Sequence, residues 1–469
     1  MLDFMDYVQR AFERGSGWNR ENSYENITAT SDSLINFAVP TSFKFQTADR
    51  PSSNMFNTME ITAHKRISGS IAYLYTDVDG MNELLEGSQT RTLQEATETY
   101  RHIQPHFLKQ QSQPQSALQL RRYNRFKPKS LYYGRMFYPS SILEAMIVKR
   151  WSPYHQLTVK SLSSINSPLN VILVNWQRYR DDNFQEVTFS SEGALCGYRF
   201  LHNVVSSPSK FNNSLYNNSS LAVGGEIWLG LSTLTPGCST SLRYCTHAAT
   251  TGRPLTLTFS WNPLFGHISS TYSAKTSMNS TFSAKYDFNL YSTDSNLSFG
   301  CEFWRKSFRT GEDGSVVKDE KTSADAVHPS AFLDMEKLPH AANEGHAPIP
   351  EQQQRLLDDV THTFSSSLEK IDKEKAIIDE FETSFNTEPF SNVWKLATSL
   401  RDKNLRILWE GKFKGFLLSA GTEVFLTREY MNSVLQSINQ DESAKVAAQE
   451  TSAGSSTPIN FGLTIQYSS

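Results

Sequence analysis

Long apolar runs are missing from this 469-residue chain. A membrane-spanning helix needs about 18 or more consecutive apolar residues, and the most apolar short stretch, 169–176, is interrupted by Asn170 and Asn175. A helical membrane protein is therefore excluded. A membrane β-barrel is not, because each of its strands crosses with about 9–11 residues and turns only alternate ones to lipid.

Charge of one sign, cysteine and catalytic motifs are scarce as well. Lys and Arg number 45 against 48 Asp and Glu, a net charge of -3, which argues against nucleic acid as a direct partner. The four cysteines have no CxxC spacing, so neither a zinc site nor a disulfide framework is predicted. No HExxH, phosphate-binding glycine loop or nucleophile elbow is present. The sequence predicts no enzyme, no cofactor and no metal.

The chain does show apolar and polar residues that alternate with a period of two. In 255–262 the odd positions are Leu, Leu, Phe and Trp, and the even positions are Thr, Thr, Ser and Asn. The same pattern recurs in 282–291, 297–304 and 405–413. Because successive side chains of a strand point to opposite faces, each segment has one apolar and one polar face.

A soluble sandwich would show the same alternation, but three features favour a membrane barrel. The strands are numerous and evenly spaced. Charges such as Arg243, Lys285 and Glu302 stand in mid-strand, as a wet lumen permits. Aromatic residues lie near strand ends, as in the interfacial girdles of barrels; they are Tyr138, Trp151, Tyr272, Tyr291, Trp304 and Trp409. The predicted fold is all-β, a single porin-like transmembrane barrel.

We predict about nineteen strands within a barrel region of 35–467, the first at 35–48. A break at Pro40 would split that strand and make twenty. Three insertions interrupt the series: 77–128, 307–390 and 428–457. The second is charged and contains an amphipathic helical stripe, formed by Leu357, Val360, Phe364, Leu368, Ile371 and Ile378.

The amino-terminal region, 1–20, is expected to be an amphipathic helix. Its apolar residues recur at helical spacing: they are Leu2, Met5, Val8 and Phe12. Acidic residues offset Arg10 and Arg14, which does not suit a transit peptide. We therefore expect a helix that stays on the mature protein and docks, with an inner-wall position near Leu408 as one possible place.

The carboxyl-terminal strand carries a short motif with a mechanism. A polar residue, a glycine two positions on and two spaced hydrophobic residues match the sorting signal of mitochondrial barrels; here they are Asn460, Gly462, Ile465 and Tyr467. An insertase must pair with the exposed edge of the last strand, so that strand must be extended. The plainer interpretation is a strand that closes the barrel, and both can hold.

The chain resembles a specific family over nearly its full length. The stretches that carry the resemblance include SYENITATSDSLINF, KSLYYGRMFYPSSILEAMIVKR, PSKFNNSLYNNSSL, GRPLTLTFSWNPLFGHISSTYSAKT, KYDFNLYSTDSNLSFGCEFW and SLRDKNLRILWEGKFKGFLLSAGTE. They are similar to the fungal mitochondrial distribution and morphology barrel that belongs to the ER–mitochondria encounter structure (ERMES).

The resemblance implies a nineteen-stranded barrel in the mitochondrial outer membrane at ER–mitochondria contact sites. It implies partners: the ERMES subunits with lipid-binding tubular domains, the sorting and assembly machinery, subunits of the outer-membrane translocase, and membrane lipids. The expected roles are tethering, phospholipid exchange, mitochondrial morphology and DNA inheritance, and help in barrel and translocase assembly. The alternative is a metabolite pore of the voltage-dependent anion channel type, which the large charged insertions and the mixed lumen disfavour.

Two aromatic pairs are candidate partner-binding sites on the wall: Tyr73 with Tyr75, and Tyr286 with Phe288. Aromatic residues are common anchors in interfaces, although such residues also simply face lipid. Strand counting adds a geometric expectation. The insertions 77–128 and 307–390 follow strands three and fifteen, so both should emerge at one rim and could form a joint docking surface. An odd strand total requires the first and last strands to pair in parallel.

Overall fold

The computed structural model describes residues 2–64, 66–78, 81, 85–101, 103, 126–164, 170–180, 182–204, 219–248, 250–306, 377–378, 380–425 and 459–469. All of them belong to one compact unit, residues 1–306 and 374–469. None of the helices in these ranges has the length and apolarity to cross a membrane.

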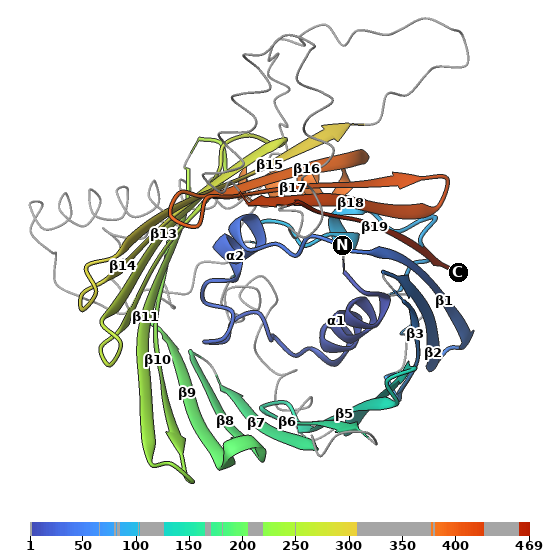
Figure 1. Ribbon diagram of the computed structural model, residues 1–469, viewed down its shortest axis with the longest axis horizontal. Coiled ribbons are helices and arrows are strands. Elements are labelled where there is room, and N and C mark those ends of the chain that lie inside the picture. Colours follow the sequence, from blue (N-terminus) through green and yellow to red (C-terminus); the bar gives the residue numbers. More distant parts are fainter. Residues whose placement is uncertain are drawn as a thin grey trace, which may run out of the picture. The chain divides into compact units, whose positions relative to one another are not determined.

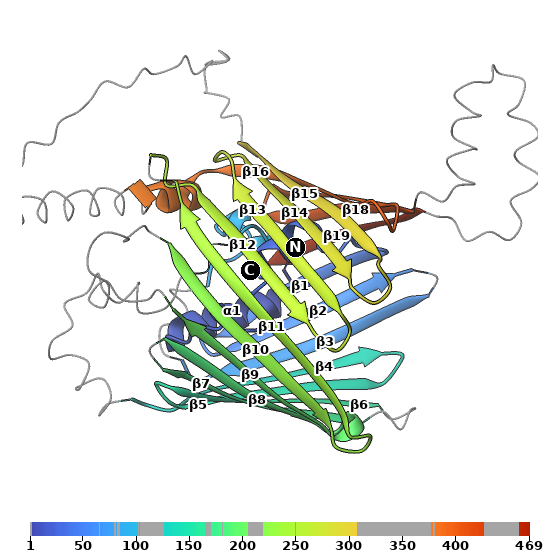
Figure 2. The same ribbon diagram turned by 90° about the vertical axis from the view of Figure 1, so that its left-hand side faces the viewer.

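Nineteen strands form one sheet in which each strand pairs with its sequence neighbours. The first and last strands, β1 and β19, also pair and close the sheet into a barrel (Figures 1 and 2). The strands are β1 (Phe43–Ser52), β2 (Met55–Ala63), β3 (Ile67–Thr76), β4 (Lys129–Tyr138), β5 (Ile142–Ser152), β6 (His155–Ser164), β7 (Val171–Arg180), β8 (Asn183–Ser190), β9 (Leu195–Asn203), β10 (Ser220–Gly230), β11 (Thr235–His247), β12 (Pro254–Asn262), β13 (His267–Lys275), β14 (Ser280–Asn289), β15 (Ser295–Lys306), β16 (Phe390–Ser399), β17 (Asn404–Phe413), β18 (Phe416–Phe425) and β19 (Ile459–Ser468).

Every sequential pair is antiparallel, and β1 with β19 is the single parallel pair in this sheet. Tight turns join most neighbours. Between β17 and β18, for example, Lys414 and Gly415 have φ of 45° and 84°, the left-handed conformations that a two-residue hairpin turn needs. The predicted barrel class, strand total and parallel closure are confirmed.

The amino-terminal end of the barrel differs from the prediction. The first strand was expected at 35–48, but β1 begins at Phe43, and residues Ala29–Ile35 form the helix α2. Leu34, Ile35 and Phe37 are buried, so their apolar side chains fill space inside the barrel instead of alternating across a wall. Pro40 lies in the link between α2 and β1 and does not split a strand.

Helices α1 (Phe4–Ser16) and α2 lie inside the ring of strands (Figure 1). Their apolar faces pack on the inner wall, where α1 contacts β1 to β5 through Ala48, Phe56, Leu74, Leu131 and Val148 among others. Two short helical pieces are α4 (Leu93–Ala96) and η1 (Glu192–Ala194), the latter in the β8–β9 turn. We call residues 2–42 together with 85–101 the lumen plug.

The expected stripe of α1 is buried: Leu2, Met5, Val8 and Phe12 are all 6% exposed or less. Its position near Leu408 is wrong, however. Leu408 packs with Phe37, Val39 and Ala397 instead, because the chain after α2, and not α1, passes along that part of the wall.

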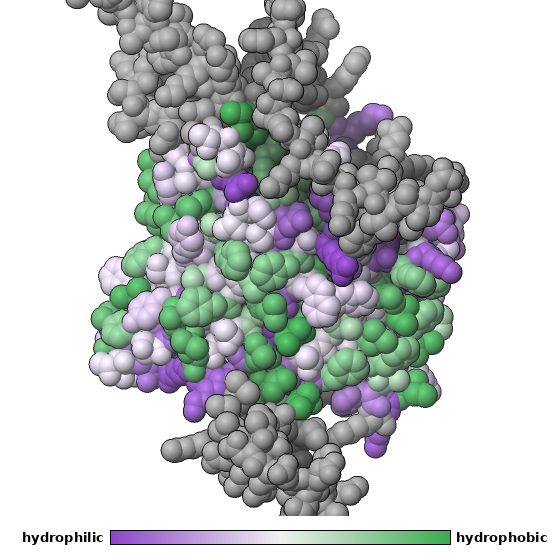
Figure 3. All heavy atoms as spheres, turned by 90° about the horizontal axis from the view of Figure 1, so that it is seen from above, coloured by the Kyte–Doolittle hydropathy of each residue, from purple (hydrophilic) through white to green (hydrophobic). Residues whose placement is uncertain are grey.

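The outer wall is apolar, as the alternation predicted. On β3, Ile71, Tyr73 and Tyr75 are exposed while Ala72 and Leu74 are buried. Hydrophobic side chains spread over the wall in Figure 3, with hydrophilic ones mostly toward its margins. Trp304 departs from the predicted aromatic girdle. It points inward, is 3% exposed and contacts the rings of Phe385 edge-on and Phe390 at a tilt, because its place in the alternation is the lumen face.

The insertion 307–390 is described only in its last part, where residues 380–387 are helical and Ile378 is buried. The other members of its predicted stripe lie outside the described residues, as does all of 428–457.

Candidate functional site

The seam between β1 and β19 carries the predicted sorting residues. Gly462 and Asn460 pair with Gly421 and Glu423 of β18. Ile465 and Tyr467 pair with Phe45 and Thr47 of β1. The ring of Tyr467 contacts that of Phe416 on the outer face, with 5.3 Å between the centroids. The strand thus has an outer face with Ile465 and Tyr467 and an inner face with Gly462.

Gly462 and its partner Gly421 form what we call the glycine notch. A Cβ at Gly462 would overlap the carbonyl of Pro40 and lie 2.6 Å from Ser42 N. A Cβ at Gly421 would lie 2.8 Å from Val39 Cγ1 and 3.0 Å from Pro40 Cδ. The chain that enters β1 therefore passes so close to the inner wall that only glycine fits on both strands.

The lumen plug bridges the seam from inside. Gln46 of β1 donates a hydrogen bond to the Asp3 carboxylate. Gln466 of β19, with its amide oriented to satisfy both neighbours, donates to Leu2 O (3.1 Å) and accepts from Phe4 N (3.3 Å). The start of α1 thus hydrogen-bonds to both strands of the parallel pair.

A second contact holds the end of β19. Ser88 N donates to Ser468 O (3.0 Å), and Ser468 N donates to Ser88 Oγ (3.1 Å). Ser469 N donates to Ala48 O of β1 (3.2 Å). The final residues are therefore fixed both to the plug and to the first strand.

Charged groups continue this arrangement along the inner wall. Lys44 Nζ lies 2.8 Å from Glu60, and Arg135 contacts both Glu60 and Asp3, the latter at 3.3 Å. The network links β1, β2 and β4 to the residue that precedes α1. Because these side chains are largely withdrawn from water, removal of one partner would leave an uncompensated charge and destabilise this part of the wall.

The other end of α1 is held by cations. Lys129 Nζ donates to Gly15 O (2.8 Å), and Arg150 donates to Ser16 O. Carbonyls at a helix carboxyl terminus carry partial negative charge and lack helical partners, so cations there stabilise the helix. Gly17 ends the helix in the left-handed conformation (φ 75°), which glycine adopts readily.

The first insertion packs inside the barrel over its described part. The guanidinium of Arg91 lies 3.6 Å from the centroid of the Tyr7 ring, and burial lowers the pKa of Arg91 to about 10. Lys412 Nζ donates to the carbonyls of Gln89 and Arg91, both at 2.8 Å. Residues 85–101 therefore connect α1 to β17.

The two predicted aromatic pairs face outward on separate parts of the wall. Tyr73 and Tyr75 are 56% and 45% exposed on β3. Tyr286 is 47% exposed and Phe288 is half-buried on β14. β3 and β14 are far apart around the ring, so the structure does not bring the two pairs together.

An apolar groove of about 480 Å³ lies beside Tyr286. It is lined by outward residues of β13 to β17, including Tyr272, Phe282, Ala284 and Phe299. Ala284 precedes Tyr286 by one step on the same face of β14.

Within the described ranges, no three His, Cys, Asp or Glu side chains gather in a way that could hold a metal ion. The four cysteines are free thiols. The buried charges of the lumen instead pair with one another and with backbone carbonyls.

Comparison with known proteins assigns the whole chain to one family. A family model described as "Mitochondrial distribution and morphology protein 10" matches residues 1–469. The chain belongs to this family. A Saccharomyces cerevisiae protein of that name is 48% identical over 492 residues, with 100% of both chains covered. Relatives of the same name from Zygosaccharomyces rouxii and Candida glabrata are 49% and 43% identical, also over 100% of both chains.

Sequence reasoning missed several residues that shape this family member's seam. Gln46, Gln466 and Ser88 had no motif to mark them, since each acts through hydrogen bonds to a segment that is distant in the sequence. Glu60 and Arg135 gave a usable signal, because both are charged residues in mid-strand on the polar face. Gly421 resembled any strand glycine until its pairing with Gly462 was known.

Proposed function

We propose that this protein is a barrel of the mitochondrial outer membrane, located at ER–mitochondria contact sites. There it anchors the tethering complex ERMES, which supports phospholipid exchange, mitochondrial morphology and DNA inheritance. It also assists the sorting and assembly machinery in maturing outer-membrane barrels and the translocase. The proposal includes no catalytic activity, and nucleic acid is not a direct partner.

The membrane setting is supported by the closed sheet and by the apolar character of its outer face. Large hydrophobic side chains exposed on that wall include Ile71, Met136, Leu143, Ile172 and Ile227. A monomeric soluble protein rarely exposes so many contiguous apolar side chains. In a bilayer the same side chains face lipid, and closure leaves no unpaired strand edge.

The observation that carries the adaptor role is the presence of two outward aromatic pairs on distant strands, one of them beside an apolar groove. Aromatic side chains are enriched among interface anchors. Two separate sites allow one barrel to serve two assemblies. We propose that one pair binds an ERMES subunit and the other binds the sorting and assembly machinery.

The test replaces each pair by alanine, Tyr73→Ala with Tyr75→Ala and Tyr286→Ala with Phe288→Ala, and reads both complexes on native gels from mitochondria. Each double variant should lose one complex and keep the other. Tyr198→Ala with Phe200→Ala is a matched control, because these stacked aromatic residues have similar exposure on β9. Equal loss of both complexes in every variant would mean general destabilisation and would refute the two-site proposal.

The lumen plug distinguishes the adaptor from a metabolite pore. Residues 2–42 and 85–101 pack within the ring and contact both sides of it. Reconstituted in planar bilayers, the protein should pass much less current than an open barrel of this size. High, anion-selective conductance in the intact protein would favour the pore.

A further inference from the structure

Three neighbouring hairpin turns present apolar side chains at one rim of the barrel. They join β10 to β11 (231–234), β12 to β13 (263–266) and β14 to β15 (290–294). The turns follow one another along the rim, because β11 pairs with β12 and β13 pairs with β14 (Figure 2). We call their large apolar residues, which are 45% to 74% exposed, the apolar turn cluster; they are Leu231, Leu234, Leu264, Phe265, Leu290 and Tyr291.

The cluster is confined to part of this rim. Antiparallel pairing places the turns after even-numbered strands at the same rim, and two others there, 139–141 and 191–194, read Pro-Ser-Ser and Ser-Glu-Gly-Ala. The turn after β16 contains Arg401 and Lys403. Arg401 pairs at 3.0 Å with Asp294, the only charged residue in the three apolar turns. Apolar tips are therefore a local feature and not the composition of every turn at this rim.

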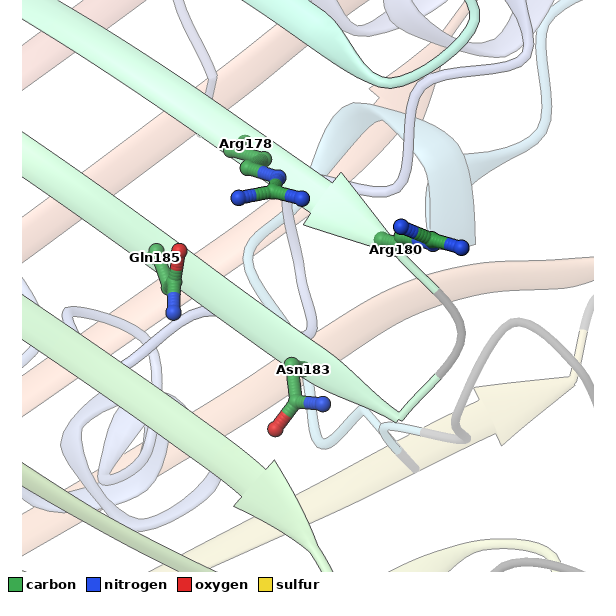
Figure 4. Close-up of a pocket in the computed structure, with 4 residues that line it drawn as sticks. All are labelled: Arg178, Arg180, Asn183 and Gln185. Carbon is green, nitrogen blue, oxygen red and sulfur yellow. The ribbon is translucent and has the colours of Figure 1, made fainter.

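The outer wall ends differently at the other rim. There the outer face of the β7–β8 hairpin ends in polar side chains that line a pocket; they are Arg178, Arg180, Asn183 and Gln185 (Figure 4). At the β12–β13 turn the apolar face continues instead, since the exposed Phe259 and Trp261 of the wall are followed by the exposed Phe265. The apolar surfaces of the wall and of the turn are therefore continuous.

Leu234 has a backbone conformation that is unusual for its side chain. Its φ is 52°, in the left-handed region that glycine and asparagine adopt most easily. The side chain is 74% exposed, so in water the leucine gains no packing that would offset the strain. Contact of this side chain with an apolar medium would offset it.

Hydrogen bonds within the protein satisfy polar groups that these turns would bring into a membrane. Leu231 N donates to Ala194 O of the β8–β9 turn (3.0 Å). Leu290 N donates to Gly266 O (2.8 Å). The Tyr291 hydroxyl donates to a carbonyl of the β12–β13 turn (2.8 Å). Because an unsatisfied N–H or O–H group is costly in lipid, these turns meet a condition that contact with acyl chains imposes.

We propose that the apolar turn cluster lies within the membrane and contacts the acyl chains of its lipids, an inference that rests on the proposed outer-membrane setting. Lipid is favoured over a protein partner because the cluster continues the apolar face of the wall. On this side of the barrel the lipid-contacting belt then reaches the tips of the hairpins.

The test measures how fast single cysteines react with a charged maleimide in the full chain, with its four native cysteines replaced by alanine. The protein is held in phosphatidylcholine nanodiscs, both faces of which are open to the reagent. Leu234→Cys, Phe265→Cys and Tyr291→Cys should react about tenfold or more slowly than the controls, because maleimide attacks the thiolate and apolar surroundings disfavour it. The controls are Ser140→Cys and Glu192→Cys, in polar turns of the same rim. A cluster variant that does not fold is replaced by one from the same turn: Leu231→Cys, Leu264→Cys or Leu290→Cys.

Phe259→Cys, on the outer face of β12, separates the proposal from the membrane setting on which it rests. If Phe259→Cys reacts slowly and the cluster variants react as fast as the controls, the turns lie in water and the proposal alone is overturned. If Phe259→Cys also reacts fast, the wall does not face lipid and the membrane setting fails too. Cluster cysteines that react fast in nanodiscs but slowly in isolated mitochondria would assign the turns to a protein partner and overturn their contact with lipid.

Discussion

Gly462 has one predicted role and one that the structure shows. It belongs to the predicted sorting motif, and it faces Pro40 and Ser42 at close range in the glycine notch. Gly462→Ala should destabilise the folded barrel by about 1–3 kcal/mol, the typical cost of overpacking. The measurement is thermal unfolding of the protein in detergent.

Gly421→Ala separates the two roles, because Gly421 contacts the same segment but lies outside the motif. If Gly462 is needed only for packing in the glycine notch, both variants should lose similar stability and assemble at similar rates after import. A delay in assembly that is confined to Gly462→Ala would assign the glycine to the sorting signal.

Glu13 makes the stability of the plug depend on pH. Burial raises its pKa, opposed by Arg20 and by a hydrogen bond from Gln9. The folded state therefore keeps the proton to higher pH than the unfolded chain does, for which 4.5 is the ordinary value. Where the folded state binds more protons, the free energy of unfolding falls as pH rises.

Glu13 should thus favour folding fully below pH 4.5 and lose that contribution as pH rises through its folded pKa. Glu13→Gln should remove this part of the pH dependence and be more stable than wild type at pH 7. Melting curves between pH 4 and pH 8 provide the measurement. Glu21→Gln, whose side chain is 47% exposed, is the control; a wild-type curve parallel to that of Glu13→Gln would contradict the prediction.

At the scale of elements, the two faces of β19 carry different groups of residues. Ile465 and Tyr467 are outside, where an insertase would meet them, and Gln466 is inside, where it contacts α1. Ile465→Gln with Tyr467→Gln should leave the imported precursor sensitive to protease. Gln466→Leu should assemble at the normal rate but loosen α1, which limited proteolysis of the amino terminus would detect.

The opposite outcome, normal assembly of the outer-face variant, would leave β19 as a closing strand without a signal. A delay in both variants would mean that docking of α1 and handover to the insertase are one step.

Strands were the most predictable elements and the plug the least. The alternation in 255–262 or 282–291 determines which face is apolar, and that face is outward in the structure. Residues 29–37 have apolar positions that fit either a strand or a helix. Their helix depends on a site that only the folded barrel supplies, since α2 packs where Gly300 leaves room for Leu34.

The position of α1 could not be predicted from the sequence either. Its apolar stripe predicted docking on an inner wall, and the lumen provides that wall. The choice of β1 to β5 instead of the region of Leu408 depends on charges at both ends of the helix. Asp3 meets Arg135, and the last carbonyls meet Lys129 and Arg150. These partners are 100 or more residues away in the chain.

At the scale of the whole molecule, strand parity makes a topological prediction. The insertions 77–128 and 307–390 follow β3 and β15, so both leave the barrel wall at the same rim. Epitope tags placed at residues 112 and 330 should show the same protease access in intact mitochondria and in mitochondria with ruptured outer membranes.

Cleavage of one tag in intact organelles and of the other only after rupture would mean that the strand count between them is wrong. The strand total itself could be predicted from the sequence because alternation marks each crossing. The filling of the lumen could not, because the segments that fill it pack by contacts with many strands at once.

The parallel pairing of β1 with β19 determines when the barrel can close. Residues 43–48 pair in parallel with residues 463–468, which are synthesised after the other eighteen strands of the sheet. Until then β1 has only one neighbour, and Leu2, Asp3 and Ser88 lack their contacts with β19 or with the closed inner wall. The ring therefore cannot close before the last of its nineteen strands has been synthesised, and the pairing of β1 with β19 is the step that completes it.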